Sequence, residues 1–395
     1  MMLTIPVPVF FNETGVFRGR TLDLDAFALP LSICISIVSM VLFPQLFKSL
    51  ISYSFLKLIA VPLAWCFIFL LGGIVSGFID PSLLLIYIAP IPGAIFLGRW
   101  LRSNYFSQRE MVVNLLSISF FTCSLIALLH ILSSYFSYGL IGSFVVRGED
   151  SIFGFFSIYQ KLVYYPTLIS CYLFLGAGLI LQGRRTLALL ICYCIIVVDV
   201  LIIGSRESIL IAFFSILFLL YSRPRKALIF FLIFISLILV LQIVNFNFPQ
   251  NNDIIFINKW ISLAESGNYS AGRLGAMQKV FSTSVDEFNV VFGTFFSMSL
   301  GDIRTPHNQY LELFLRSGIL GISIFFVMIF GLILNIRYTC RFYHKDFLVK
   351  SLAVMLMVFL FVSFNINTPI RAPLTSTLFY TLVAFFYFKP RLEFK

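Results

Sequence analysis

Long runs of apolar residues, separated by short polar connections, dominate the pattern of this chain. A helix that crosses the roughly 30 Å hydrocarbon core of a bilayer needs about 20 such residues. Because the runs are continuous rather than alternating in polarity, they predict helices and not the strands of a barrel. The eleven predicted spans are 27–46, 58–78, 81–98, 111–132, 164–181, 186–203, 208–221, 227–244, 318–336, 347–364 and 374–388.

The composition supports this pattern and removes the soluble alternatives. Of the 395 residues, 60% are hydrophobic and 11% are charged, whereas an average soluble domain has about 45–50% and 25%. So few charged side chains could not cover a soluble core of this length, and so many apolar residues exclude disorder. We therefore expect an all-α, polytopic integral membrane protein, with residues 1–395 forming a single membrane domain.

Positive charge collects on one side of the predicted spans. Seventeen of the 28 Lys and Arg residues fall in every second connection or at the end of the chain, which identifies that side as cytoplasmic. The N-terminus is then outside, the C-terminus is inside, and the net charge of +11 needs no nucleic-acid partner. Six of the seven cysteines lie inside spans, so we expect neither disulfides nor thiol chemistry.

Two connections on the outer side are long, residues 133–163 and residues 245–317. Loops above about 15 residues are usually functional or disordered. In the second loop, residues 253–264 have apolar positions at helical spacing, which suits a helix lying on the bilayer surface. Ser270 is a suitable cap for a further helix over residues 271–284. We expect this large outer loop to carry part of the functional site.

The strongest motif follows this loop, with Thr305-Pro306-His307-Asn308 and, after nine intervening residues, Gly318-Ile319-Leu320-Gly321. Thr305 is a good N-cap and Pro306 a good first helical residue, which would place His307 in the first turn. There the helix dipole helps to keep the imidazole neutral, as a general base requires. A single helix over residues 306–336 would be roughly 46 Å long, so it either projects outward or is broken at Ser317-Gly318.

Two arginines on the outer side are candidate ligands for an anion. Arg206 lies in Gly204-Ser205-Arg206-Glu207-Ser208, between the sixth and seventh spans, and Arg273 lies in the large outer loop. Guanidinium groups are always charged and bind phosphate through two parallel hydrogen bonds. The pair therefore indicates a polyanionic ligand, although snorkelling at a helix end or a solvated loop charge would also explain each arginine.

Several other polar residues are open to more than one interpretation. Asp199 lies inside a span, where a carboxylate is costly, so it has either a functional role or a structural hydrogen bond to a neighbouring helix. Glu312 is spaced to pair with Arg316 at i,i+4. Arg304, Arg316 and Arg371 are expected on the outer side, as helpers that attract an anionic donor or as surface charges. His130 and His344 are expected to be incidental.

The motif His-Asn-x9-Gly-x-x-Gly, the Gly-Ser-Arg turn and the arginine-bearing outer loop together resemble the O-antigen polymerase and O-antigen ligase superfamily. These proteins are glycosyltransferases of the Gram-negative bacterial inner membrane. The resemblance implies a glycan donor carried on undecaprenyl diphosphate and chemistry on the periplasmic face, with residues 245–317 as a large periplasmic loop. It also allows for a chain-length regulator protein as a partner.

The resemblance also implies roles for individual residues. Arg206 and Arg273 would bind the diphosphate and stabilise it as it leaves, and His307 would take the proton from the acceptor hydroxyl. Five further residues would bind substrate: Ser205, Asn308, Arg304, Arg316 and Arg371. Neither a metal nor another cofactor is implied, and the cytoplasmic side lacks the Asp-x-Asp typical of metal-dependent nucleotide-sugar enzymes.

The leading hypothesis is an O-antigen polymerase that joins lipid-linked repeat units. An O-antigen ligase, which would transfer the glycan to lipid A–core, shares the mechanism and is the first alternative. A transporter or flippase for lipid-linked sugars is the second. A transporter would predict inverted repeats and broken midplane helices, and Pro90-Ile91-Pro92-Gly93 is the one such break in the apolar runs.

Overall fold

The computed structural model describes residues 90–145, 165–183, 186–203, 205–223, 290–293, 308–366, 369–371 and 373–387, with isolated positions at 64, 67, 68 and 88. Every regular element within these ranges is helical, as the sequence predicts. The elements are α5 Pro90–Ser107, α6 Arg109–Val145, α8 Tyr165–Gln182, α9 Thr186–Ile203, α10 Arg206–Ser222, α14 Gln309–Phe342, α15 Phe347–Val358, the π-helix η2 Phe359–Ser363, α16 Phe364–Ile366, the 3₁₀ helix η3 Pro369–Arg371 and α17 Pro373–Tyr387.

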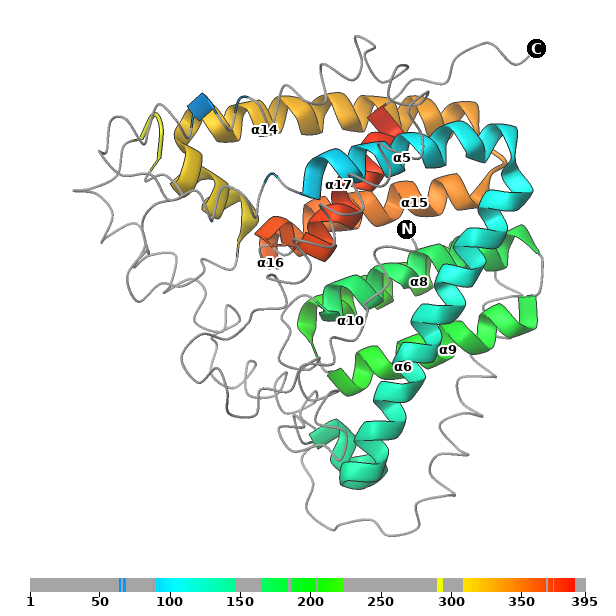
Figure 1. The fold of residues 1–395 in the computed structure, drawn as a ribbon. Coiled ribbons are helices and arrows are strands. Elements are labelled where there is room, and N and C mark those ends of the chain that lie inside the picture. The colour runs from blue at the N-terminus through cyan, green and yellow to red at the C-terminus, as the bar shows by residue number, and fades with distance from the viewer. Residues whose placement is uncertain are drawn as a thin grey trace.

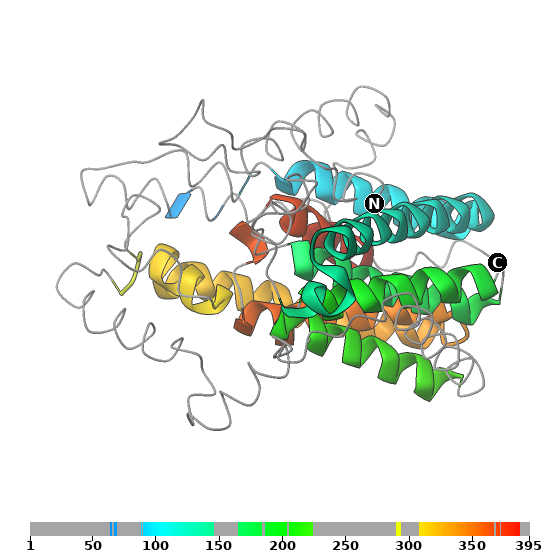
Figure 2. The ribbon, with the colours of Figure 1, turned by 90° about the horizontal axis from the view of Figure 1, so that it is seen from below.

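These helices form a bundle of two groups (Figure 1). In one group α5, α14, α15 and α17 lie together, with α17 packed most extensively on α5. In the other, α8 lies between α9 and α10, and α6 packs along α9. Seen from below, α6 and the α8–α10 group lie in front of much of the first group (Figure 2). The contact between α15 and α8 joins the two groups, so one hydrophobic core extends through both.

Four helical stretches are long and apolar enough to cross a bilayer: Arg109–Leu132, Thr186–Ile203, Gln309–Phe342 and Phe347–Ile366. Three shorter apolar helices, Pro166–Gln182, Glu207–Ser222 and Thr375–Tyr387, accompany them. These seven stretches coincide with seven predicted spans, so the described part of the chain is an α-helical membrane protein. Runs 27–46 and 227–244, and most of run 58–78, lie outside the described residues, and the number of eleven spans stays a prediction.

Two predicted boundaries are wrong because a helix does not end where an apolar run ends. The run 81–98 stops before Arg99, but α5 continues to Ser107. Arg102 is buried within it, where Nη1 donates to the carbonyl of Phe385 on α17 at 2.9 Å. Its guanidinium also lies 5.2 Å from the ring centre of Phe106 and 5.4 Å from that of Phe385. The carbonyl of Phe385 and the two aromatic rings thus stabilise Arg102 within the helix, at a position that the apolar pattern assigned to a loop.

The second wrong boundary is at the outer loop 133–163, because α6 continues to Val145. A helix of 37 residues is about 55 Å long, well beyond the 30 Å of a bilayer core.

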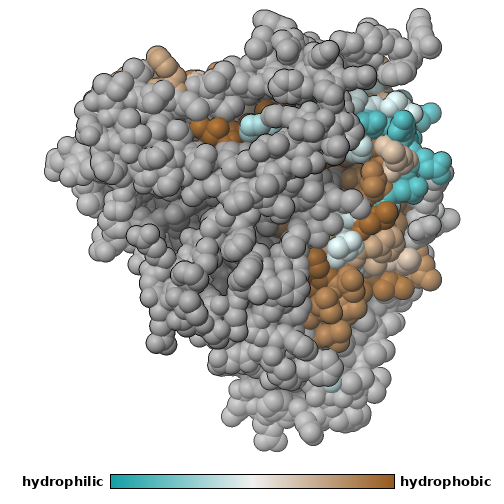
Figure 3. Space-filling view, in the orientation of Figure 1, coloured by the Kyte–Doolittle hydropathy of each residue, from teal (hydrophilic) through white to brown (hydrophobic). Residues whose placement is uncertain are grey.

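Met111, Ile118, Leu125 and Leu132 are exposed on α6 at a spacing of seven residues. Figure 3 shows a hydrophobic strip below a hydrophilic corner on the side of the bundle where α6 lies. An exposed apolar strip of this length is suited to contact with lipid.

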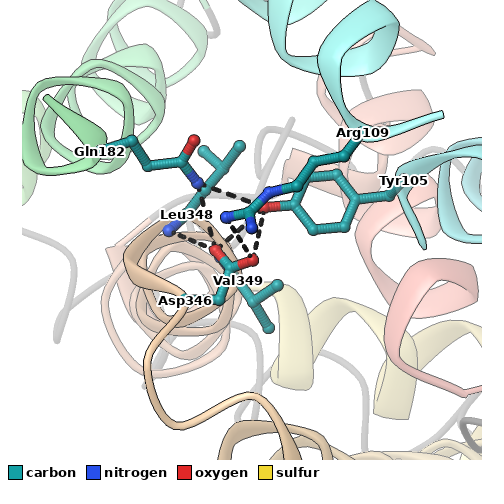
Figure 4. A network of polar contacts seen from close by, with 6 residues as sticks. All are labelled: Tyr105, Arg109, Gln182, Asp346, Leu348 and Val349. Carbon is teal, nitrogen blue, oxygen red and sulfur yellow. Dashed lines mark hydrogen bonds and ion pairs between the residues drawn. The ribbon is translucent and has the colours of Figure 1, made fainter. Parts of the chain in front are cut away.

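A polar cluster around Asp346 joins four helices at the end of the bundle where α5, α8 and α14 finish, the basic end (Figure 4). The Asp346 carboxylate caps α15 by accepting from the backbone N–H groups of Leu348 and Val349 at 3.0 and 3.2 Å. It also accepts from the Tyr105 hydroxyl of α5 at 2.8 Å and from Gln182 Nε2 of α8 at 3.2 Å. Arg109, at the start of α6, lies 2.9 Å away. Burial, and then the charge of Asp346, raise the pKa of Tyr105, so the phenol remains a donor.

The described cysteines lie within helices. No disulfide joins Cys123, Cys171, Cys192, Cys194 and Cys340, and three of them are fully buried in the helical core. Small apolar residues are common in such positions.

Candidate functional site

The start of α14 carries the described part of the histidine motif. Asn308 is the N-cap, and its side-chain oxygen accepts from the backbone N–H of Leu311 at 2.9 Å. The prediction that Thr305 caps this helix is therefore wrong. Asn is at least as good a cap as Thr, and Asn308 satisfies a backbone donor that the first turn would otherwise leave unpaired. Thr305 and His307 themselves lie outside the described residues.

Gly318 divides α14 into two segments. Its φ of 62° and ψ of −164° are not helical, and Figure 1 shows the first segment at a steep angle to the second. This confirms the alternative in which Ser317-Gly318 breaks the helix. The nine residues between Asn308 and Gly318 therefore form a separate short helical segment at the end of the transmembrane part of α14.

A turn from the large outer loop docks at this break. Val290 and Val291 accept from the backbone N–H groups of Ile319 and Leu320 at 2.9 and 3.3 Å. A Cβ atom on Gly318 would collide with the carbonyl of Val291, and it would lie 2.6 Å from the nitrogen of Phe292. The missing side chain thus lets two backbones meet. The contact fixes residues 290–293 of the loop against the start of the transmembrane segment.

A buried ion pair lies on the first segment of α14. Arg316 Nε is 2.9 Å from Glu312 Oε1, and the side chains are only 5% and 0% exposed. The pairing at i,i+4 is as the spacing predicts. The arginine is not a surface charge, because it is enclosed and directed at Glu312. A role for Arg316 in substrate binding stays a prediction.

The first segment of α14 packs against the π-helix η2. The Tyr310 hydroxyl donates to the carbonyl of Leu360 in η2 at 2.8 Å, and Gln309 Oε1 accepts from the backbone N–H of Ile370 in η3 at 2.9 Å. The Tyr310 ring also packs edge-on against Phe364, with ring centres 5.6 Å apart. Single turns of π-helix inside α-helices are frequent at functional sites. These contacts hold the start of α14 over η2, α16 and η3.

The start of α10 reaches the same end of the bundle. At the opposite end of α10, the guanidinium of Arg223 lies 5.7 Å from the ring centre of Phe347, the first residue of α15. The seventeen residues of α10 rise about 25 Å from there, and α10 contacts η2 as well as α15. Arg206 is therefore the first helical residue at the level of η2 and α16, rather than part of the preceding turn.

The backbones of four predicted site residues thus lie around one end of the bundle. Ser205 is the N-cap of α10, with extended backbone and no capping bond from its hydroxyl. Arg206 and Arg371 are described by their backbones alone, at the starts of α10 and in η3, and Asn308 caps α14. His307, Arg273 and Arg304 lie outside the described residues.

Buried polar side chains are concentrated at this end, and among them only Glu207 and Ser208 belong to a segment that the sequence singled out. Within the core they would be costly unless hydrogen-bonded. They come from the first two turns of α8, the first turns of α10 and α17, and η2. The members are Thr167, Ser170, Glu207, Ser208, Ser363, Thr375 and Ser376. Together with Gln309 and Glu312 they make the interior beneath Asn308 polar.

A second buried polar contact lies between α6 and α9. His130 Nδ1 and Asp199 Oδ1 are in direct contact, and both side chains are almost completely buried. The structure therefore provides the interhelical hydrogen bond that was one of the two interpretations of Asp199, and His130 is not incidental to the packing. The two residues are 69 positions apart, so no local pattern could have paired them.

Comparisons with known proteins add no assignment to this geometry. Among the residues that the structure describes, no three of His, Cys, Asp and Glu lie close enough together to share a metal ion. No family model matches the chain, and neither the curated proteins nor the solved structures contain a match.

Proposed function

We propose that this protein is an O-antigen polymerase, which joins undecaprenyl-diphosphate-linked repeat units on the periplasmic face of the bacterial inner membrane. One observation carries the proposal. The motif that resembles the O-antigen polymerase and ligase superfamily coincides with a structural element, because Asn308 caps α14 and Gly318 breaks it after nine intervening residues. The polar interior beneath this element supports a site for a polar substrate at the membrane boundary.

The proposed reaction transfers a glycan from the diphosphate of the donor to a hydroxyl of the acceptor. A bond forms between the acceptor oxygen and the anomeric carbon of the donor, and the bond from that carbon to the diphosphate breaks. Arg206 and Arg273 would neutralise the charge that develops on the leaving diphosphate. His307 would accept the proton of the acceptor hydroxyl, and Asn308 would hold the histidine at the start of α14.

The experiment that tests this function is deletion of the gene in its host, followed by analysis of the lipopolysaccharide. A polymerase predicts lipid A–core capped with single repeat units. Bare core would instead indicate a ligase, and lipid-linked repeat units that accumulate on the cytoplasmic leaflet would indicate a flippase. Either of these two outcomes would overturn the proposal.

Complementation of the deletion then tests the site. His307→Ala and Arg206→Lys are expected to restore no long-chain product while the protein still inserts in the membrane. Arg185→Lys, on the opposite side by charge distribution, is the matched control and is expected to restore it fully. Wild-type chain lengths from His307→Ala and Arg206→Lys would remove both residues from the site.

A further inference from the structure

The basic end of α14 presents three cations that have no counter-ion among the described residues. Arg337 and Arg341 are exposed one turn apart on the helix, and Lys345 is exposed in the turn that follows it. Three other cations of the described part have partners: Arg109 pairs with Asp346, Arg316 pairs with Glu312, and Arg223 lies over an aromatic ring. Arg337 and Arg341 of α14 and Lys345 of the turn after it differ from these cations.

The same face of α14 continues as an apolar stripe toward the middle of the membrane. Tyr338, Leu334, Phe330 and Val327 are exposed on it, Val327 by as much as 73%. At about 100° per residue, these four positions and the two arginines fall within an arc of about 100°. The opposite face is buried in the bundle through Phe325, Leu332 and other core residues.

The length of α14 places the cations at the level of the lipid headgroups. From Gly318 to Phe342 the helix rises about 37 Å, which exceeds a 30 Å hydrocarbon core by almost five residues. Arg337 and Val327 are about 15 Å apart along the axis, roughly half the core thickness. The stripe therefore matches one leaflet, with cations and a tyrosine at the headgroups and apolar side chains along the acyl region.

We propose that this face of α14 is a binding site for an anionic phospholipid of the leaflet on the basic side of the protein. The phosphate lies between Arg337 and Arg341, with Lys345 adding charge and the Tyr338 hydroxyl donating a hydrogen bond. The acyl chains lie along Leu334, Phe330 and Val327. Charge complementarity selects the anionic lipid, because the charged residues that the structure describes on this face are cations with no paired carboxylate, and the cytoplasmic leaflet carries negative charge.

The test measures the binding of phosphatidylglycerol and phosphatidylethanolamine to the purified full chain in mild detergent by native mass spectrometry. Each basic residue near an anionic lipid is worth roughly a fivefold change in affinity. The combined change Arg337→Gln, Arg341→Gln and Lys345→Gln should therefore weaken phosphatidylglycerol binding by about 100-fold. The charge-preserving change Arg337→Lys and Arg341→Lys should leave most of the affinity in place.

The matched control removes three other basic residues, Lys389, Arg391 and Lys395, and so alters the net charge equally. It should leave phosphatidylglycerol binding within about threefold of the wild type. Equal losses in the two triple variants would show only general attraction to charge and would overturn the proposal. So would wild-type binding of phosphatidylethanolamine as tight as that of phosphatidylglycerol.

Discussion

Replacing Gly318 with alanine tests how the outer end of α14 is built. The backbone of Gly318, at φ 62° and ψ −164°, lies in a region that is essentially restricted to glycine. Forcing alanine into it costs about 1–3 kcal/mol. The new Cβ would also collide with Val291 and displace the docked turn. Loss of the two hydrogen bonds to Ile319 and Leu320 adds about 0.5–1.5 kcal/mol each. Gly318→Ala should therefore lower the free energy of unfolding by about 4 kcal/mol.

The assay is equilibrium unfolding in mixed detergent micelles, followed by circular dichroism. Gly331→Ala is the matched control, because Gly331 lies in the same helix and a Cβ atom there would meet nothing within 4 Å. Alanine is the better helix former by about 1 kcal/mol, so this control should be neutral or stabilising. A Gly318→Ala protein within 1 kcal/mol of the wild type would refute both the helix break and the docking of residues 290–293.

Three further changes test other contacts by the same unfolding measurement. Asp346→Ala should lower the free energy of unfolding by about 3 kcal/mol, because α15 loses its N-cap and the buried Tyr105 hydroxyl loses its acceptor. A loss below about 1 kcal/mol would show that the cluster does not stabilise the packing of the four helices. Asn308→Ala should cost about 1 kcal/mol and Asn308→Asp almost nothing, and equal losses would argue against the cap. Arg316→Met should cost about 3–5 kcal/mol, because Glu312 would remain charged and buried, and the double variant with Glu312→Leu should recover most of it. An equally unstable double variant would contradict this account of the pair.

The sequence predicts the long apolar helices well and their ends poorly. The run 186–203 coincides with α9 because charged or polar residues flank it on both sides and the helix stops with them. The ends of α5 and α6 differ because helical hydrogen bonding continues through Arg99, Arg102 and residues 133–145, whether or not lipid surrounds them. Hydropathy reports where the lipid is, and the end of a helix is set by capping and tertiary contact.

In the candidate site, too, the sequence predicts the local features and misses the contacts between distant parts of the chain. Local signals were sufficient for the pairing of Glu312 with Arg316, and they reduced the course of α14 to two alternatives, one of which was the break at Ser317-Gly318. The contact of Tyr310 with Leu360 and that of His130 with Asp199 join distant parts of the chain. A single sequence contains no signal for such pairs. The choice between Thr305 and Asn308 as N-cap was also beyond the sequence, because both residue types are good caps.

The most direct test of the proposed function is reconstitution of the purified protein with an undecaprenyl-diphosphate-linked repeat unit as the sole donor and acceptor. The account predicts a ladder of lipid-linked products that grow by whole repeat units, without added metal or nucleotide sugar, and no ladder from His307→Ala. Reconstituted wild-type protein that leaves the repeat unit unchanged, or a ladder of the same length from His307→Ala, would contradict it.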